Sequence, residues 1–420
     1  MNTRPSTRGA DHEQQTANRA CRRSVRAAGG SGLPRLVVRE PTRGTGSGRR
    51  RGVGRRHQPG RQRAGYVAGS AVHRRRRQGL GERRDPDPHG HAADRALAEQ
   101  PGAEIDARAL TAGPVLDITG DYASIEGLTL RNCSGTAILL RAAHFHLLSS
   151  VVESCDVGVD VAENAGDILL EHNRFTNDRV GVRFAAPNRN TMVVGNTFQQ
   201  DKDAGLWAVR GTADGRGGAI GVRENHFIAD GSGVVAGNVG LLVERNEFAN
   251  ARDAAIHLIG AGAVIRGNQI RSGAAMGIVA ENAGEAVIDS NELEQFATYA
   301  IMVRGSGNAL VRANRIHNCG YGLAFVLGDP RRPSSAVGNT IIEPKFNGID
   351  IIGDSPILRH NEVLRPHAFA LHVLDYQTPG GQTFAARPFL EGNNFRADAV
   401  QTPEDLQMPD SQMRAAARRQ

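Results

Sequence analysis

The sequence has few aromatic residues, few cysteines and no long apolar run. Only 5% of its 420 residues are aromatic, with a single tryptophan, and its four cysteines include no CxxC pair, which argues against a structural zinc site or a thioredoxin-type motif. No apolar run approaches the roughly 18–20 residues of a transmembrane helix. Residues 1–30 also lack the apolar core of a secretory signal. We therefore expect no membrane span, and the chain as written carries no export signal.

Charge divides the chain near residue 90. Residues 1–90 hold 22 arginines and 6 acids, a balance of +16, whereas the remainder holds 29 basic and 38 acidic residues, a balance of −9. The first part has no apolar periodicity, so residues 1–94 are predicted to be an Arg/Gly-rich segment that is either disordered or read in a wrong frame. Because the folded part is acidic, we expect no nucleic-acid partner for it.

A short pattern, Asn-x-(Phe/Ile/Leu/Val), recurs after residue 94, as in EHNRF, VGNTF and RENHF. Its asparagines are Asn173, Asn196, Asn225, Asn246, Asn268, Asn291, Asn314, Asn339, Asn361 and Asn393. They are separated by 23, 29, 21, 22, 23, 23, 25, 22 and 32 residues. A period near 22 with occasional insertions is typical of a solenoid.

A second marker keeps the same spacing. Eight or nine residues after the first nine of these asparagines comes Gly or Ala, followed by an alternating apolar strand such as Gly181-VRF or Gly277-IVA. A coil of about 22 residues is too short for a strand plus a helix, and the alternation has period 2. Each coil should therefore consist of three short strands, and the stacked coils should form three parallel sheets. The 51 glycines fit an all-β fold with many tight turns.

The asparagines are expected to form a ladder. We expect each one to adopt the left-handed backbone of a tight turn and to hydrogen-bond the turns above and below it. The apolar residue two places later should point inward, so that Phe175, Phe198, Phe227 and Phe248 stack on one another. Cys133 and Cys155, 22 residues apart, should also be stacked, as a disulfide or, the interpretation we favour, as two buried thiols.

The ladder, the Gly-Ile-x-Val strand and the period together resemble the right-handed parallel β-helix of the pectin-lyase-like superfamily. The resemblance covers roughly residues 105–400. We therefore predict a β-helix over residues 95–400 and a polar tail over residues 401–420. Members of the superfamily include polysaccharide lyases, alginate epimerases and accessory proteins of the NosD type. The resemblance implies a periplasmic or secreted location and allows a calcium cofactor.

In that superfamily the strand before the first turn lines the substrate groove, and the resemblance places the Gly-Ile-x-Val strand there. Its outward residues would form one row. They are Leu139, Asp160, Arg183, Trp207, Val235, His257, Val279, Met302, Ala324, Asp350 and His372.

A first candidate patch lies around Trp207. Its members are Asp160, Arg183, Lys202, Trp207, Arg210 and His257. Trp207 would stack on a sugar ring, Arg183 would bind a uronate carboxylate, and Lys202 or His257 would act as the base. Asp160 and Arg210 would add substrate contacts. The alternative is an ordinary solvated face.

A second candidate patch lies near the end of the row, where Asp350 and His372 should be cross-coil neighbours about 5 Å apart. With Lys345 and Tyr376 nearby, His372 or Lys345 would be the base and Tyr376 the acid. A surface cluster without function is again the alternative.

These residues predict a polysaccharide-active protein of lyase or C5-epimerase type that acts on an anionic, uronate-containing glycan. The competing hypothesis is a non-catalytic periplasmic or surface β-helix of the NosD kind, because the sequence contains no subfamily catalytic signature. Val235, Val279 and Ala324 in the groove row are apolar, which also leaves room for a binding role.

Overall fold

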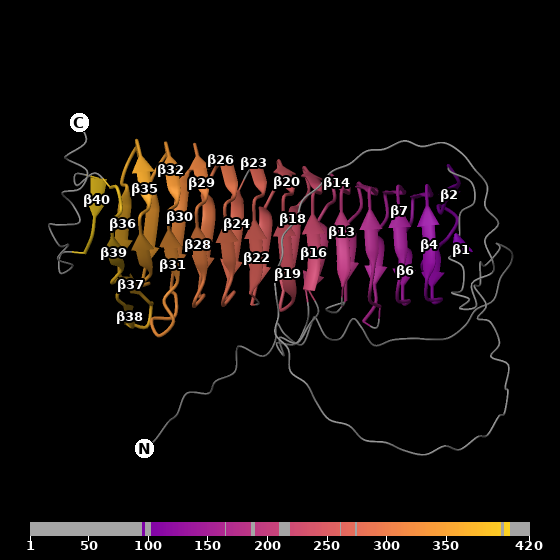
Figure 1. Ribbon diagram of the computed structural model, residues 1–420, viewed down its shortest axis with the longest axis horizontal. Coiled ribbons are helices and arrows are strands. Elements are labelled where there is room, and N and C mark those ends of the chain that lie inside the picture. The colour runs from indigo at the N-terminus through magenta and orange to yellow at the C-terminus, as the bar shows by residue number, and fades with distance from the viewer. Residues whose placement is uncertain are drawn as a thin grey trace, which may run out of the picture. The chain divides into compact units, whose positions relative to one another are not determined.

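The computed structural model describes residues 95–96, 102–163, 165–185, 190–209, 219–260, 262–273, 275–395 and 399–403. Our predictions for residues 1–94, and most of the predicted tail at 401–420, lie outside these ranges. In the described residues three short strands alternate with turns, coil after coil, and all inter-coil pairing is parallel (Figure 1). The prediction of an all-β, three-sheet parallel solenoid is confirmed.

The first sheet, which we call sheet A, has thirteen strands. They are β1 (Arg95–Ala96), β4 (Ala123–Glu126), β7 (His146–Leu148), β10 (Leu169–Glu171), β13 (Thr191–Val194), β16 (Ala219–Arg223), β19 (Gly240–Glu244), β22 (Ala263–Arg266), β25 (Val287–Asp289), β28 (Leu310–Arg312), β31 (Ser335–Val337), β34 (Ile357–Arg359) and β39 (Phe389–Glu391).

The second sheet, sheet B, has twelve strands. They are β2 (Glu104–Asp106), β5 (Thr129–Arg131), β8 (Val151–Glu153), β11 (Arg174–Thr176), β14 (Thr197–Gln199), β17 (His226–Ile228), β20 (Glu247–Ala249), β23 (Gln269–Gly273), β26 (Glu292–Phe296), β29 (Arg315–His317), β32 (Thr340–Ile342) and β35 (Glu362–Leu364).

The third sheet, sheet C, again has thirteen strands, and a hairpin of two strands follows β36. Sheet C consists of β3 (Leu116–Ile118), β6 (Thr136–Leu140), β9 (Val157–Val161), β12 (Val180–Phe184), β15 (Ala204–Val209), β18 (Ser232–Gly237), β21 (Ala254–Ile259), β24 (Met276–Glu281), β27 (Tyr299–Arg304), β30 (Tyr321–Val326), β33 (Ile349–Ile352), β36 (Leu371–Leu374) and β40 (Val400–Gln401); the hairpin is β37 (Tyr376–Gln377) with β38 (Thr383–Phe384).

The core is a set of inward rows that run from coil to coil. Phe175, Phe198, Phe227 and Phe248 are buried and stack in sequence, with ring centroids 5.0, 4.7 and 4.7 Å apart. Each belongs to sheet B and lies two residues after a ladder asparagine, as predicted. Burial of these rings removes a large apolar area from water in every coil.

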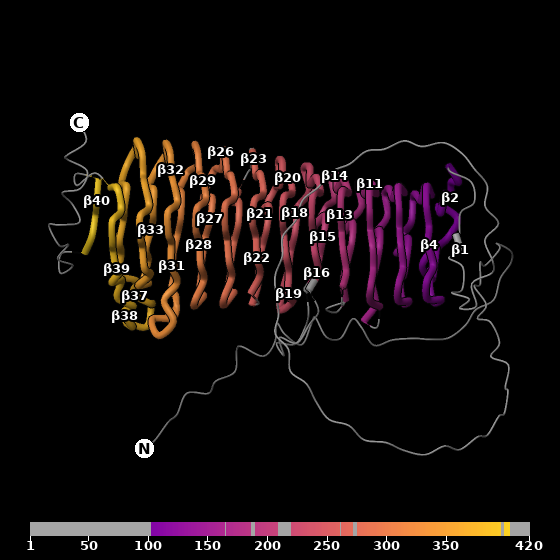
Figure 2. The backbone as a smooth tube through the Cα atoms, in the orientation of Figure 1, coloured from indigo at the N-terminus to yellow at the C-terminus, as the bar shows by residue number. Residues whose placement is uncertain are grey.

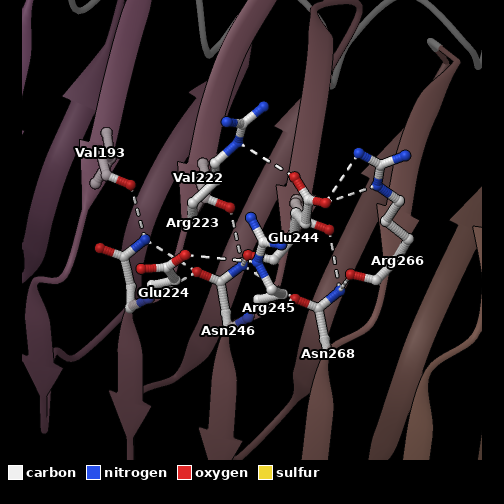
Figure 3. Close-up of polar contacts among 11 residues, drawn as sticks. Val193, Val222, Arg223, Glu224, Glu244, Arg245, Asn246, Arg266 and Asn268 are labelled. Carbon is white, nitrogen blue, oxygen red and sulfur yellow. Dashed lines mark hydrogen bonds and ion pairs between the residues drawn. The ribbon is translucent and has the colours of Figure 1, made fainter. Parts of the chain in front are cut away.

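The asparagine ladder occupies the turns between sheets A and B. Every predicted member is buried, and the backbone N–H of each donates to Oδ1 of the next, from Asn173 through Asn393. The Nδ2 atoms also donate to carbonyl oxygens of sheet A, as Asn246 does to Val222 at 2.9 Å (Figure 3). The ladder therefore satisfies buried polar groups at the same corner of each of these coils.

One detail of the ladder differs from our expectation. The left-handed backbone belongs to the residue before each asparagine, with φ of 54° at His172, 55° at Glu224 and 54° at Arg245, and not to the asparagine itself. The expectation was wrong because the asparagine side chain must point between the coils to bond its neighbours. The preceding residue turns the chain, and Gly fills several of these positions.

A charge ladder runs outside this corner on sheet A. Arg223, Glu244, Arg266, Asp289 and Arg312 are partners in successive strands and alternate in sign. Glu244 is nearly buried, lies 3.3 Å from Arg223 and accepts two contacts of 2.9 Å from Arg266 (Figure 3). The alternation removes like-charge repulsion between strands about 4.8 Å apart.

Cys133 and Cys155 form a disulfide between adjacent coils. Our interpretation of two buried thiols is therefore wrong, because stacking in neighbouring coils places the two side chains in direct contact. Cys319 is a buried free thiol.

Replacing Asn225 by alanine is expected to lower the free energy of unfolding by about 1–3 kcal/mol, because the backbone N–H of Asn196 and the carbonyl of Val193 would lose buried partners. Urea denaturation would measure the change. Replacing the exposed amide Gln269 by alanine is the control and should change stability by less than about 0.5 kcal/mol. Equal effects of the two changes would contradict the structural role of the ladder.

Candidate functional site

The outer face of sheet C carries the predicted row. The strand registers place each member beside the next, from Leu139 beside Asp160 to Asp350 beside His372. The successive coils can be followed in Figure 2. Sequence spacing thus located the whole row. Exposure along the row is uneven, since Val235, Val279, Ala324 and Asp350 are buried although they face outward.

At the Trp207 end, the predicted cation Arg183 forms an ion pair within the chain. The guanidinium of Arg183 donates two hydrogen bonds to Asp160, at 2.9 and 2.6 Å, and this carboxylate raises the pKa of Arg183 above its usual value. Arg183 therefore already has a bidentate carboxylate partner within the chain. Trp207 is the next residue in the row and is half-buried.

The other residues of the first patch are spread over turns and strands. Lys202 is exposed in the turn before β15, and Arg252 donates to the carbonyl oxygens of Asp201 and Lys202 at 3.0 and 2.8 Å. His257 lies two strands beyond Trp207, with Nε2 3.5 Å from Glu281. Arg210 lies outside the described residues. No contact that we observe in the described residues brings Lys202 or His257 to Trp207, so the His257–Glu281 pair lies apart from the tryptophan.

At the other end of the row, Asp350 and His372 form a contact. Asp350 Oδ1 lies 3.1 Å from His372 Nδ1, and Asn347 Nδ2 donates to the same oxygen at 2.7 Å. The hydroxyl of Tyr299 donates to Oδ2 at 3.3 Å. Only 3% of Asp350 is exposed, so this carboxylate is buried yet has three polar partners. The expected His–Asp pair is present.

The geometry determines which nitrogen of His372 is available. Asn347 Nδ2 also lies 3.2 Å from His372 Nδ1, but it donates at the shorter distance of 2.7 Å to Asp350. A carboxylate can only accept, so the tautomer that suits Asp350 carries its hydrogen on Nδ1 and leaves the Nε2 lone pair free. About 20% of the His372 side chain is exposed, whereas Asp350 lies behind it. Burial, first, and then the charge of Asp350 raise the pKa of Tyr299 above its usual range, so Tyr299 remains a hydroxyl donor.

Aromatic rings form one wall of this site. Tyr299 stacks on Tyr321 with centroids 4.6 Å apart, and Tyr321 stacks on Phe346 at 4.9 Å. Phe369 stacks beside His372 at 5.6 Å and holds the imidazole orientation from the adjacent turn. Phe346 is 48% exposed, so the wall has an apolar surface open to solvent.

Two loops lie at the corner that follows sheet C. A side chain on Gly353 would meet Leu327, Tyr376 and Phe384, which shows that the turn after β30 and the hairpin β37–β38 pack together around this glycine. Tyr376 contacts Phe384 within the hairpin, with ring centroids 6.3 Å apart. Lys345 is exposed in the turn two residues before Asn347. Lys345 thus precedes β33 and Tyr376 follows β36, and no contact that we observe in the described residues brings either side chain to the Asp350–His372 pair.

The sequence interpretation missed Tyr299 and Asn347. Each directly precedes the Gly or Ala marker of its coil, and Tyr321 occupies the same position in the coil between them. A signal was present, because tyrosines at this position in consecutive coils are unusual in a chain with five tyrosines. Only the folded structure shows that the Tyr299 side chain crosses two coils to reach Asp350.

The described residues contain no group of three or more His, Cys, Asp or Glu side chains placed to hold a metal ion. The calcium that the resemblance allows would find no such set of ligands among these residues. In the same residues no helix is long and apolar enough to cross a membrane.

Comparison with known families identifies the fold. The family described as right handed beta helix region matches residues 115–236 and 212–363, more than half of the chain. The chain belongs to this right-handed β-helix family. No curated protein matches the sequence of this β-helix.

Several solved structures are similar to this chain. The catalytic unit of a thermostable GH87 α-1,3-glucanase from Streptomyces thermodiastaticus strain HF3-3 is 14% identical, with a TM-score of 0.53, over 70% of this chain and 63% of that one. The periplasmic alginate epimerase AlgG is 14% identical over 70% and 79%, with a TM-score of 0.45. The Streptococcus pneumoniae surface adhesin PfbA is 10% identical over 71% and 90%, with a TM-score of 0.44. At such identities the likeness concerns the fold alone.

Proposed function

We propose that this β-helix acts on a uronate-containing polysaccharide by acid–base chemistry at the Asp350–His372 pair. The observation that carries the proposal is the buried Asp350 carboxylate, which contacts His372 on one oxygen and Tyr299 on the other. A carboxylate that accepts a hydrogen bond from Nδ1–H fixes the tautomer and the orientation of a histidine. This is a recurrent way to make Nε2 an effective base. At the Trp207 end, His257 lies 3.5 Å from Glu281, but this carboxylate is partly exposed, and Arg183 is already bound to Asp160.

The reaction follows from the groups present. His372 Nε2 would remove the proton on C5 of the uronate, which is acidic because the neighbouring carboxylate delocalises the developing charge. Lys345 would neutralise that charge. In a lyase the electron pair forms the C4=C5 double bond, the C4–O bond breaks, and Tyr376 protonates the leaving oxygen. In an epimerase a proton returns to C5 from the opposite face, and no bond to the chain breaks.

A screen of uronate polymers tests the proposal. Purified protein would be incubated with alginate, pectate and glycosaminoglycans, with ultraviolet absorbance of the conjugated double bond as the readout for a lyase and exchange of the C5 hydrogen with deuterated water for an epimerase. We expect one of these signals from at least one polymer. Absence of both, for every polymer, contradicts the enzymatic proposal.

The aromatic wall favours a second candidate, a non-catalytic glycan-binding protein. The exposed Phe346 ring could stack on a sugar face without any chemistry. A polymer that binds but shows neither absorbance nor exchange, and whose affinity falls on Phe346→Ala, would support this alternative.

We also propose a periplasmic or extracellular location, supported by the Cys133–Cys155 disulfide, since such bonds persist in oxidising compartments. Peptide mapping of the native protein without reductant tests it. Recovery of both cysteines as free thiols from cells would contradict it.

A further inference from the structure

A second buried polar row lies at the turns between sheets B and C. It consists of Asp178, Asp201 and Asp230, each five residues after a ladder asparagine, in three successive coils. Their exposed fractions are 1%, 0% and 0%. None of the three belongs to the candidate site. Buried carboxyl groups without a countercharge are costly, so this row needs a physical account.

One oxygen of each aspartate has a partner. Oδ1 of Asp178 accepts from the backbone N–H of Cys155 at 2.7 Å, that of Asp201 from Asp178 at 3.0 Å, and that of Asp230 from Asp201 at 2.9 Å. These bonds repeat the pattern of the asparagine ladder, in which Oδ1 accepts the backbone N–H of the coil before it.

The second oxygen of each aspartate differs from the asparagine case. An asparagine Nδ2 donates to a carbonyl oxygen, whereas Oδ2 of Asp178, Asp201 and Asp230 is buried without a hydrogen-bond partner among the described residues. Glycines of sheet C adjoin these oxygens, and a side chain on Gly181 would come within 2.8 Å of Asp201 Oδ2. An ionised carboxylate would therefore leave charge on a buried oxygen that accepts no hydrogen bond from the described residues.

The surroundings oppose ionisation. Burial is the largest cause and raises the pKa of Asp178 to about 8, of Asp201 to about 10 and of Asp230 to about 7. The negative charge of Glu153 in β8 also raises the pKa of Asp178. The charges of Asp230 and Asp178 raise the pKa of Asp201 further. Arg252, beyond β20, is the charged group that favours ionisation of Asp230.

We propose that the Asp178–Asp201–Asp230 row is a pH-sensitive element, which holds its three coils closed as neutral acids and loosens them when the carboxyl groups ionise. The direction follows from linkage. The pKa of each of these acids is higher in the folded chain than in the unfolded chain. The stabilisation of the fold by the neutral acid is therefore complete at pH below the pKa of the unfolded chain, and it is lost as pH rises through the pKa of the folded chain. The loss should extend from about pH 4 to pH 10.

Loosening of these three coils would also affect the adjacent outer face of sheet C. Asp201 directly precedes Lys202, and Arg252 binds the carbonyl oxygens of both residues. The strand that follows is β15, which carries Trp207. Ionisation should therefore open the Trp207 end of sheet C before the Asp350–His372 end, where the described residues hold one such carboxyl group, Asp354, and not a row of three. This inference does not depend on the proposed activity.

Urea denaturation at several pH values tests the element. The wild-type chain, Asp201→Asn and the control Asp156→Asn would be compared between about pH 5 and pH 9. Asparagine keeps the Oδ1 acceptor and removes the titrating group. We expect the urea midpoint of Asp201→Asn to rise relative to that of the wild type as pH increases. The difference in midpoint between Asp156→Asn and the wild type should not change with pH, because the Asp156 carboxyl group lies at the surface and has a lowered pKa. Histidines also titrate in this pH range, but their contribution is the same in the wild type and the variants and is removed when the midpoints are subtracted.

Hydrogen exchange of the wild-type chain gives a second measurement, which does not need the variant to fold. Peptides from 174–185 and 190–209 should lose protection by at least about tenfold relative to peptides from 314–326 between the same pH values, after correction for intrinsic exchange. Parallel midpoints for Asp201→Asn and wild type, or equal loss of protection in the two regions, would overturn the proposal. Asp230→Asn replaces Asp201→Asn if the latter fails to fold.

Discussion

Replacing His372 by alanine is expected to lower the turnover of an active uronate polymer by about 10²–10⁴-fold, the usual contribution of a positioned general base. The expectation rests on the 3.1 Å contact with Asp350, which fixes the tautomer and directs Nε2 outward. Steady-state kinetics with the polymer found in the screen would measure it. Asp350→Asn should lower kcat as well, with KM nearly unchanged, because Asp350 is buried behind the imidazole.

His226→Ala is the matched control for this experiment. His226 is an exposed histidine on sheet B that pairs with Glu247 at 3.2 Å, so its loss removes an imidazole far from the row on sheet C. Its kinetics should equal those of the wild type. If His372→Ala retains full activity while Trp207→Ala loses it, the active centre is at the Trp207 end and the assignment of the base to His372 is wrong.

Replacing Phe198 by alanine should lower the free energy of unfolding by about 3–5 kcal/mol. The ring is fully buried between Phe175 and Phe227, so the change removes apolar burial and leaves a cavity that neighbouring coils cannot fill without moving their own stacked rings. Urea denaturation monitored by circular dichroism would measure the loss.

Phe389→Ala serves as the control for Phe198→Ala. The Phe389 ring is 51% exposed and contacts the Arg359 guanidinium at 5.6 Å from its centroid, so its removal should cost about 1 kcal/mol or less. A loss at Phe198 no larger than that at Phe389 would contradict the view that the phenylalanine stack holds the coils together.

The sequence by itself determined the repeat, the three-sheet coil, the asparagine ladder and the outward row. The reason is geometric, because side chains alternate with period 2 along a strand and equivalent residues in stacked coils are forced into register. The spacing of the ladder asparagines was therefore enough to place Phe198 inside, and the spacing of the Gly or Ala marker was enough to place Asp350 beside His372.

Only the tertiary structure decided which side chains meet across the coils. Long side chains reach past their own register, so Tyr299 contacts Asp350 two coils away, and Arg183 is bound by Asp160 instead of remaining open to a ligand. Burial is also a property of the stacked coils, which is why Asp178, Asp201 and Asp230 look like ordinary turn residues in the sequence and are enclosed carboxyl groups in the fold. Contact and solvent exclusion depend on every neighbour at once, and no single repeat contains them.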